Sequence, residues 1–275
     1  SYIGVVVNIP ANYILIHVAG LGLVGAGLAS ILSQCVSLFV ALAYWRLAPS
    51  MAPYRQAAPV SLSRISAHLR ESLPICVGYA GEGGAYAFIG IMVGWLGATA
   101  LAAHQVVNAA AGIAFVVPLG LAGAASIQVG HAVGEARQDR LRPILRAGLG
   151  ISVVWQAATA AIFILFGGMM AAALSDDADV VRLATLLFIV VGAFQIADGV
   201  QGTALGALRG ISDNTLPTVI TLLAYWPLAL PAAYILGFTL DFGAVGLMCG
   251  YVLGLAVAAV ALPWRYMRLT APAAA

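Results

Sequence analysis

The sequence predicts an all-α polytopic membrane protein with eight membrane-spanning helices, and three observations lead to this fold class. Of the 275 residues, 63% are hydrophobic and only 8% are charged, and the mean hydropathy is +1.02, whereas a soluble domain carries roughly 25% charged residues. The apolar residues form long continuous runs, but a β-barrel would show short segments of alternating polarity. The composition therefore excludes a soluble enzyme, a nucleic-acid-binding protein and a disordered regulator.

Each predicted span is an apolar run of the length needed to cross the bilayer, about 20 residues. The expected spans are 1–18, 23–45, 70–95, 101–130, 144–170, 181–207, 215–237 and 243–264. The two longest runs exceed a straight crossing, which predicts tilted or bent helices. Glycine and proline inside them are tolerable because neighbouring helices can satisfy the freed backbone groups.

The arginines predict the topology, because short cytoplasmic loops retain positive charge. The chain has no lysine, and eleven of its twelve arginines, all except Arg182, follow every second span. The alternate loops carry the acidic residues Asp176, Asp177, Asp179 and Asp241. We therefore expect a multi-pass protein of the bacterial plasma (inner) membrane, in contact with the lipid bilayer, with both ends of this chain in the cytoplasm.

An internal repeat predicts the domain organisation. Residues 10–15 resemble residues 231–236, and glycines follow at the same offset of 221 in both segments. If the last two spans repeat the first two, one six-helix lobe is complete and another is represented only by its end. The expected parts are 1–45, the last two helices of an N-terminal lobe; 46–67, a cytoplasmic linker; 68–268, a six-helix C-terminal lobe; and 269–275, a tail. The expected partners include about four missing N-terminal helices of the same protein.

Two carboxylates lie deep inside predicted spans, Glu82 and Asp198, and each is flanked by glycines. An ionisable side chain at the bilayer centre costs at least a few kcal/mol and marks a functional site by default. Desolvation and mutual repulsion favour protonation of such a pair, and a bound cation removes the same penalty. The pair is suited to a proton or to sodium, with no other metal site and no cofactor expected. The alternative is that each carboxylate is protonated and hydrogen-bonds a neighbouring helix.

Polar and aromatic residues recur on the same helix faces as a possible cavity lining. Phe194 and Gln201 lie four residues before and three residues after Asp198, which places all three on one face. Polar residues of span 101–130 recur at similar intervals. The expected lining residues are His104, Gln105, Asn108, Phe115, Phe194 and Gln201. Such a face serves either interhelical hydrogen bonding or a polar cavity.

Motifs for other chemistry are missing from the sequence. The three cysteines sit in apolar runs without metal-ligand spacing. There is no nucleophile elbow around a serine and no glycine-rich phosphate loop followed by lysine. No enzymatic activity and no nucleic-acid partner are therefore expected. Arg209, at a predicted cytoplasmic helix end, is interpreted as a loop anchor in preference to a gate.

Several spaced motifs resemble the multidrug and toxic compound extrusion (MATE) family, in its NorM-type branch. They are Gly97–Gln105 with Asn108 and Pro118, Val129–Glu135, Phe194–Gln201, Gly206–Asp213, and Tyr225-Trp226 with Leu230-Pro231. The similarity runs over essentially the whole chain, and the motifs occur in the family's order.

The resemblance implies twelve helices in two lobes, of which this chain covers helices five to twelve. It also implies cation-coupled antiport of lipophilic, often cationic, drugs and toxic compounds out of the cell. Acidic residues at the positions of Glu82 and Asp198 form the coupling-ion site in NorM-type members. Some members have tyrosine where this chain has Phe194, so an ion ligand is missing and sodium coupling is less secure than proton coupling.

Three other functions stay open on the sequence alone. One is a lipid-linked glycan flippase of a related branch, which would need a basic central cavity, yet no predicted span carries a mid-membrane arginine. Another is an intramembrane aspartyl protease that uses Glu82 and Asp198. The third is an inactive half-transporter fragment.

Overall fold

The computed structural model describes residues 2–55 and 61–271, and no strand occurs among them. The elements are α1 (Tyr2–Tyr13), η1 (Ile14–Val18), α2 (Gly22–Leu47), η2 (Pro49–Arg55), α3 (Leu62–Trp95), α4 (Ala98–Gly134), α5 (Gln138–Leu174), α6 (Ala178–Gly210), α7 (Thr215–Leu223), η3 (Ala224–Ala229), α8 (Leu230–Tyr234), η4 (Ile235–Thr239) and α9 (Gly243–Leu269). The chain divides into two units, unit 1 over Ser1–Leu62 and unit 2 over Ser63–Ala275. The predicted all-α fold is confirmed.

Seven helices of the described chain are long and apolar enough to cross a membrane, and the elements from α7 to η4 count as one of them, Thr215–Thr239. The eighth expected span, 1–18, is a shorter apolar helix, Ile3–Val18. The helices of unit 2 are longer than the apolar runs that predicted them: α4 and α5 have 37 residues each. Helical hydrogen bonding continues through the polar turns at the span ends, which a search for apolar runs does not register.

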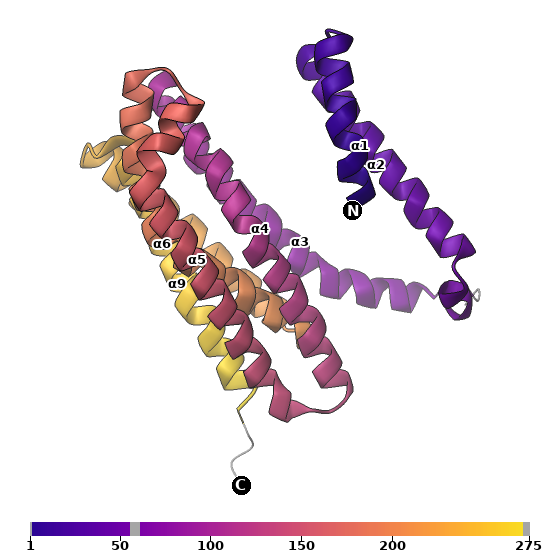
Figure 1. Ribbon diagram of the computed structural model, residues 1–275. Coiled ribbons are helices and arrows are strands. Elements are labelled where there is room, and N and C mark those ends of the chain that lie inside the picture. Colours follow the sequence, from indigo (N-terminus) through magenta and orange to yellow (C-terminus); the bar gives the residue numbers. More distant parts are fainter. Residues whose placement is uncertain (1, 56–60, 272–275) are drawn as a thin grey trace. The chain divides into compact units, whose positions relative to one another are not determined.

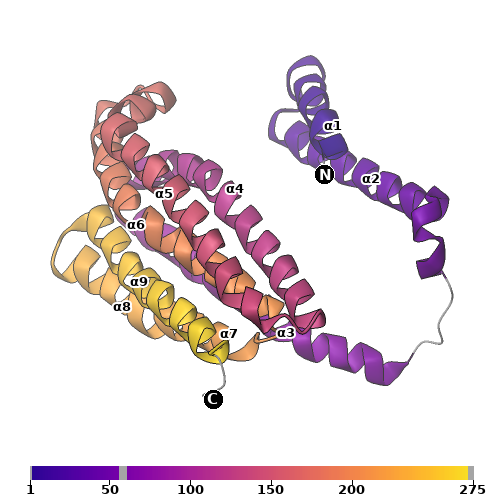
Figure 2. The same ribbon diagram turned by 60° about the horizontal axis from the view of Figure 1, so that its bottom comes forward.

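Helix α6 is the centre of unit 2 and packs directly against α4, α5 and α9. In Figure 1, α5, α6 and α9 run alongside one another, and Figure 2 shows α4 and α3 beside them from a second direction. Small residues allow the closest approaches, as is usual between membrane helices. A Cβ atom at Gly206 of α6 would overlap the backbone of Ala122 in α4, and one at Gly250 of α9 would overlap the backbone of Ala233 in α8.

Helix α3 is attached differently, because it makes few close backbone contacts with the rest of unit 2. Its contacts are made by side chains, and several of them are hydrogen bonds. The Thr218 hydroxyl donates to the Pro74 carbonyl at 2.8 Å, and the Trp226 indole donates to the Gly81 carbonyl at 3.1 Å. The helix that carries Glu82 is therefore held by these polar groups of α7 and η3, and by Ala85, Ile89, Met92 and Val93, which are buried in the hydrophobic core of unit 2.

The span from α7 to η4 is broken by two π-helical segments, η3 and η4. Pro227 lies inside η3 and Pro231 follows at the start of α8. Proline has no backbone N–H and clashes with the carbonyl one turn earlier, which accounts for a local change of helical pitch at η3. π-Helical turns of this kind are frequent at functional sites.

The local backbone of α1–η1–α2 repeats in α8–η4–α9 at the offset of 221 residues. The π-helical segments begin at Ile14 and Ile235, and the following helices begin at Gly22 and Gly243. Both glycines have positive φ angles, +50° and +58°, which favour glycine because it has no Cβ. The connecting hydrogen bonds also correspond: Leu21 N–H to Leu15 O at 3.1 Å in unit 1, and Phe242 N–H to Leu236 O at 3.2 Å in unit 2.

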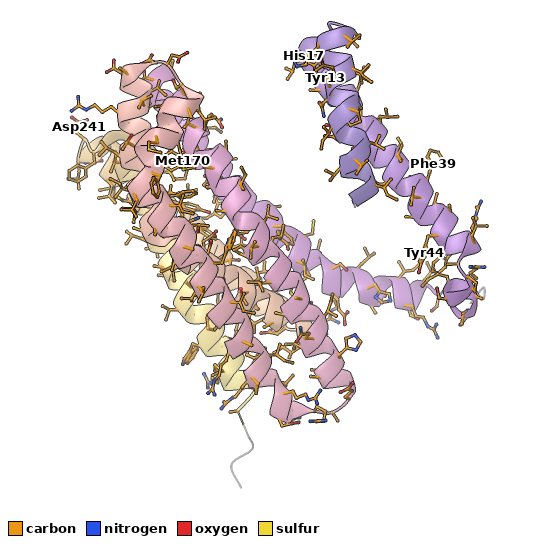
Figure 3. All side chains as sticks on the ribbon, viewed as in Figure 1. Tyr13, His17, Phe39, Tyr44, Met170 and Asp241 are labelled. Carbon is orange, nitrogen blue, oxygen red and sulfur yellow. The ribbon has the colours of Figure 1, made fainter. Side chains whose placement is uncertain are left out.

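The arginine-bearing ends of unit 2 lie together. Arg265 of α9 forms a two-point ion pair with Asp213 after α6, at 2.5 and 2.9 Å, and Arg142 of α5 donates to the Met267 carbonyl at 2.7 Å. In Figure 3, the acidic Asp241 lies toward the other end of this unit from the C-terminal end of α9, which is yellow in Figure 1. Basic and acidic loops thus occupy opposite ends of the bundle.

Candidate ion and substrate site

Glu82 on α3 and Asp198 on α6 line one cavity of about 380 Å³ in unit 2. The volume lies in the range of small-molecule pockets, roughly 300–1,000 Å³. Other side chains of its wall are Tyr79, Tyr86, Asn108, Phe115, Phe194 and Tyr251. No arginine or lysine lines this cavity in the described part of the chain, so its wall combines two carboxylates with aromatic rings.

Glu82 is held by a hydrogen-bonded chain that crosses three elements. The Gln201 amide nitrogen of α6 donates to Glu82 Oε1 at 2.9 Å. The Tyr225 hydroxyl of η3 donates to Gln201 Oε1 at 2.5 Å. Gln201 and Tyr225 are each only 1% exposed, so water does not compete for these bonds.

Asp198 is placed differently, because its carboxylate makes no hydrogen bond with any described residue, although it borders the same cavity. A second, smaller space of about 30 Å³ also has both carboxylates in its wall. A buried carboxylate without a partner is costly unless it binds a proton or a cation. Of the two carboxylates, Asp198 is thus the one without a hydrogen-bond partner among the described residues.

Arg209, at the end of α6, is the basic residue nearest to this pair. It lines the 30 Å³ space with Glu82 and Asp198. Its guanidinium donates to the Tyr79 hydroxyl at 2.6 Å and lies 4.3 Å from the centre of the Tyr79 ring. This cation–π contact and hydrogen bond hold the arginine on α3, at the border of the carboxylate site and outside the larger cavity.

Three tyrosines form a continuous aromatic wall beside the carboxylates. Tyr251 of α9 stacks on Tyr225 at 5.2 Å between ring centres and meets Tyr86 of α3 edge-on at 5.3 Å. The Tyr86 hydroxyl donates to Asn108 Oδ1 of α4. These rings link α3, α4, η3 and α9 around the cavity.

The structure brings only part of the expected lining to the cavity. Phe115, Phe194 and Asn108 line it, and Gln201 contacts Glu82 from the smaller space. His104 and Gln105 instead line a neighbouring groove of about 370 Å³, together with Asn108 and Tyr86. His104 lies one turn from Asn108, and Tyr86 reaches Asn108 between the two spaces, so a shared helix face did not mean a shared cavity.

Sequence reasoning missed the tyrosines. Tyr86 lies four residues after Glu82 on the same helix face, and this spacing was a usable signal. Tyr225 and Tyr251 are far from Glu82 in the sequence, and only the packing of η3 and α9 against α6 brings them to it. Gln195, which borders the cavity, was assigned no role either; its amide reaches Thr159 of α5 at 3.5 Å.

The oxygen atoms around Glu82 and Asp198 supply some of the ligands that a small cation needs. Among the described residues no group of three or more His, Cys, Asp and Glu side chains could hold a metal ion. A hard cation would find carboxylate oxygens from Glu82 and Asp198 and the hydroxyl and amide oxygens of Tyr86 and Asn108. Phe194 supplies no oxygen.

This fold and site define a polytopic α-helical membrane protein with a carboxylate pair in an internal cavity, the arrangement by which secondary transporters bind ions and substrates near the midplane. The family model described as MatE matches residues 74–235, more than half of the chain. The chain therefore belongs to the MATE family.

Similar proteins agree with this assignment. The chain is 32% identical over 271 residues to "Probable multidrug resistance protein NorM" of Xylella fastidiosa, with coverage of 96% of this chain and 58% of that protein. It is 38% identical over 202 residues to the protein of the same name from Rhizobium meliloti, covering 72% of this chain and 43% of that protein. The crystal structure of the eukaryotic MATE transporter AtDTX14 superposes with a TM-score of 0.86 at 21% identity, covering 97% of this chain and 62% of that one, and shows the same fold. The chain thus spans about three fifths or less of these relatives' lengths.

Proposed function

We propose that this chain supplies the ion-coupling lobe of a cation-coupled antiporter that exports lipophilic, often cationic, drugs and toxic compounds. The observation that carries the proposal is the cavity of about 380 Å³ in which Glu82 and Asp198 face a wall of aromatic rings. A lipophilic cation is matched by this combination, since carboxylates neutralise its charge and aromatic faces attract it. The relatives' name, multidrug resistance protein, supports the same substrate class.

Ion transport and substrate transport are coupled because the ion and the organic cation compete for the same carboxylates. When protons or sodium ions occupy Glu82 and Asp198, the cavity loses its negative charge and a bound organic cation loses its counter-charge. When the ions leave, the charge returns and attracts a new substrate. Alternating exposure of the cavity to the two sides of the membrane then converts the ion gradient into export.

The coupling ion is a proton or sodium, and the site places different demands on each. A proton needs only a carboxylate oxygen, and Asp198 has no hydrogen-bond partner among the described residues. Sodium needs several oxygen ligands, and Phe194 contributes none. Proton coupling therefore requires less of this site.

The proposed location is the bacterial inner membrane, with both ends of this chain in the cytoplasm. The arginine-bearing loops at one end of unit 2 support this orientation. We also propose the division into 1–45, 46–67, 68–268 and 269–275, which the repeated backbone around η1 and η4 supports. Residues 56–60 of the linker and 272–275 of the tail lie outside the described residues.

Two of the alternative functions fit the cavity less well. A lipid-linked glycan flippase would need basic residues for the diphosphate, but none lines the large cavity in the described chain, and Arg209 is held on Tyr79. An aspartyl protease would need two carboxylates that share a proton. Here Glu82 accepts a hydrogen bond from Gln201, and no hydrogen bond joins it to Asp198 among the described residues. No enzymatic activity is proposed.

The test is efflux of a fluorescent organic cation from cells that express the complete gene product, under an imposed proton or sodium gradient. The gradient that drives efflux identifies the ion. Asp198→Asn should abolish efflux at unchanged protein level in the membrane. Asp241→Asn, which removes a carboxylate at the end of the bundle, is the matched control and should retain efflux. Efflux that persists in Asp198→Asn would refute the proposal, and inserted protein without efflux under either gradient would favour a flippase or an inactive fragment.

A further inference from the structure

We propose that Gln201 and Tyr225 are positioning residues that form a two-state hydrogen-bond relay, which transmits the charge of Glu82 from α3 to the π-helical segment η3. The inference rests on the proposed function, because it describes how that carboxylate responds to its ion. It assigns roles to an amide and a hydroxyl that bind neither ion nor substrate in our proposal.

The relay has a defined direction in this structure. Gln201 donates through Nε2 to Glu82 and accepts through Oε1 from the Tyr225 hydroxyl, at 2.9 and 2.5 Å. An amide nitrogen can only donate and an amide oxygen can only accept. With Oε1 occupied by Tyr225, Nε2 must face an acceptor oxygen on Glu82; the ionised carboxylate has two such oxygens, whereas the protonated acid keeps only its carbonyl oxygen as a good acceptor and gains a donor.

Protonation of Glu82 adds a hydrogen-bond donor to the carboxyl group, which then needs an acceptor on Gln201. The acid O–H is a donor, and Gln201 can satisfy it by turning its amide through about 180° so that Oε1 faces Glu82. Nε2 then faces the Tyr225 oxygen, which becomes an acceptor, and the Tyr225 hydrogen turns away from Gln201. Both states keep two hydrogen bonds, the only proton bound is the one on Glu82, and no proton passes along the relay.

The position of the Tyr225 hydroxyl is fixed by its surroundings, which the relay requires. Its ring is 1% exposed and stacks on Tyr251 with an interplanar angle of 16°. Tyr225 belongs to η3, two residues before Pro227, where the span changes from α- to π-helical pitch. A reversal of its hydrogen bond therefore acts at the irregular part of that span.

The reversal of the Tyr225–Gln201 hydrogen bond affects the attachment of helix α3 most directly. This helix has few close backbone contacts with the bundle; its part after Glu82 packs in the hydrophobic core through Ile89 and Val93, and around Glu82 it is held by side-chain hydrogen bonds. The Trp226 indole, adjacent to Tyr225, donates to the Gly81 carbonyl, adjacent to Glu82. Neighbouring residues of η3 thus bind neighbouring residues of α3, one at the backbone and one through Gln201.

Other ionisable groups surround Glu82, and the test has to separate the relay from them. They are Tyr79 and Tyr86 on α3 itself, Asp198, Arg209 and Asp213 on and after α6, Tyr225 on η3 and Tyr251 on α9. Variants that change no formal charge leave the field of these groups in place. Gln201→Leu and Tyr225→Phe meet this condition.

The experiment measures binding of tetraphenylphosphonium to the purified complete gene product as a function of pH, without sodium. The wild-type protein should bind the probe at high pH and release it as the carboxylates are protonated. Gln201 stabilises the ionised form of Glu82, so without it protonation and release occur at higher pH. The relay keeps a hydrogen bond to Glu82 in both states, but the bond to the charged carboxylate is the stronger one. Losing both bonds therefore corresponds to an upward shift of about one pH unit for Gln201→Leu.

Tyr225→Phe keeps Gln201 but removes the donor that orients it, so its midpoint should move in the same direction by about half a pH unit, an order-of-magnitude fraction of the direct loss. Tyr234→Phe in α8, which is exposed and has no hydrogen bond through its hydroxyl among the described residues, should titrate like the wild type. A merely structural role would weaken binding at every pH and leave the midpoint unchanged. Infrared difference spectra between high and low pH should contain a glutamine amide band that Gln201→Leu removes.

The outcomes of this experiment separate failure of the relay from failure of the proposed function. If the wild type releases the probe with falling pH but Gln201→Leu and Tyr225→Phe keep its midpoint, the relay is refuted and the proposed function stands. If the wild-type protein shows no pH-dependent binding, the proposed function is refuted, and the relay falls with it. Tyr225→Phe preserves the buried ring, so the test does not depend on a variant that could fail to fold.

Discussion

Two glycines of α6, one turn apart, should respond in opposite ways to the same substitution. At Gly206 an added Cβ would lie 2.6 Å from the Ala122 carbonyl carbon and Cα, and closer still to its oxygen. At Gly202 no atom lies within 4 Å of the added Cβ. Because the overlapping atoms at Gly206 belong to the backbone of α4, they cannot move aside as a side chain would.

Helix propensity and overpacking together set the expected change in unfolding free energy of each variant. Gly→Ala in a helix interior gains about 0.5–1 kcal/mol from propensity, and this gain is common to both variants. Overpacking costs about 1–3 kcal/mol, and only Gly206→Ala incurs it. The difference in unfolding free energy between the variants should therefore be about 1–3 kcal/mol, with Gly202→Ala the more stable.

The assay is thermal unfolding of the purified proteins in detergent, followed by the fraction that remains monodisperse after heating. For a chain of this size roughly 2–4 °C of melting temperature corresponds to 1 kcal/mol, so the two variants should differ by several degrees. Equal melting temperatures, or a more stable Gly206→Ala, would refute the reasoning that close α4–α6 packing positions the helix that carries Asp198.

Two further predictions concern the cavity and the arginine-bearing end of the bundle. Phe115→Ala should weaken tetraphenylphosphonium binding by about tenfold, since a cation–π contact contributes roughly 1–2 kcal/mol in a desolvated site; Ile113→Ala, a side chain that is 75% exposed on the outside of α4, should not change the affinity measured by equilibrium binding. The half-buried Asp213–Arg265 ion pair should show a coupling free energy of about 1 kcal/mol in a double-mutant cycle of melting temperatures with Asp213→Asn and Arg265→Gln. A coupling near zero would mean that this pair does not hold α9 to the α6–α7 loop.

Much of the fold was predictable because a helix that crosses the bilayer must be a long, mostly apolar segment. Long apolar runs and the arginine distribution report where the chain crosses the membrane, and seven of the expected spans form apolar helices of sufficient length. The repeat between residues 10–15 and 231–236 also predicted that the last two spans resemble the first two. The structure has π-helical segments at equivalent places in them, beginning at Ile14 and Ile235. The π pitch itself could not be read from the sequence, since it depends on how neighbouring helices compensate lost hydrogen bonds.

The carboxylates of the site were predictable because a charge in a membrane span is expensive and stands out. Their surroundings were less so. Helical spacing groups residues of one helix, but it does not say where a cavity ends, and His104 and Gln105 face a different groove from the carboxylates. Tyr225 reaches the site only through the irregular helix η3, and its contact with Gln201 depends on tertiary packing that no local pattern encodes.

In the proposed mechanism, the coupling ion and the organic cation compete for Glu82 and Asp198. The most direct measurement is the release of ions when tetraphenylphosphonium is added to the purified complete gene product in weakly buffered solution, with a pH indicator for protons and a radioactive tracer for sodium. Binding of the probe should displace protons or sodium, and Glu82→Gln combined with Asp198→Asn should abolish the displacement. Tight binding that releases neither ion, or equal release by the double variant, would show that the probe and the ion do not compete for these carboxylates.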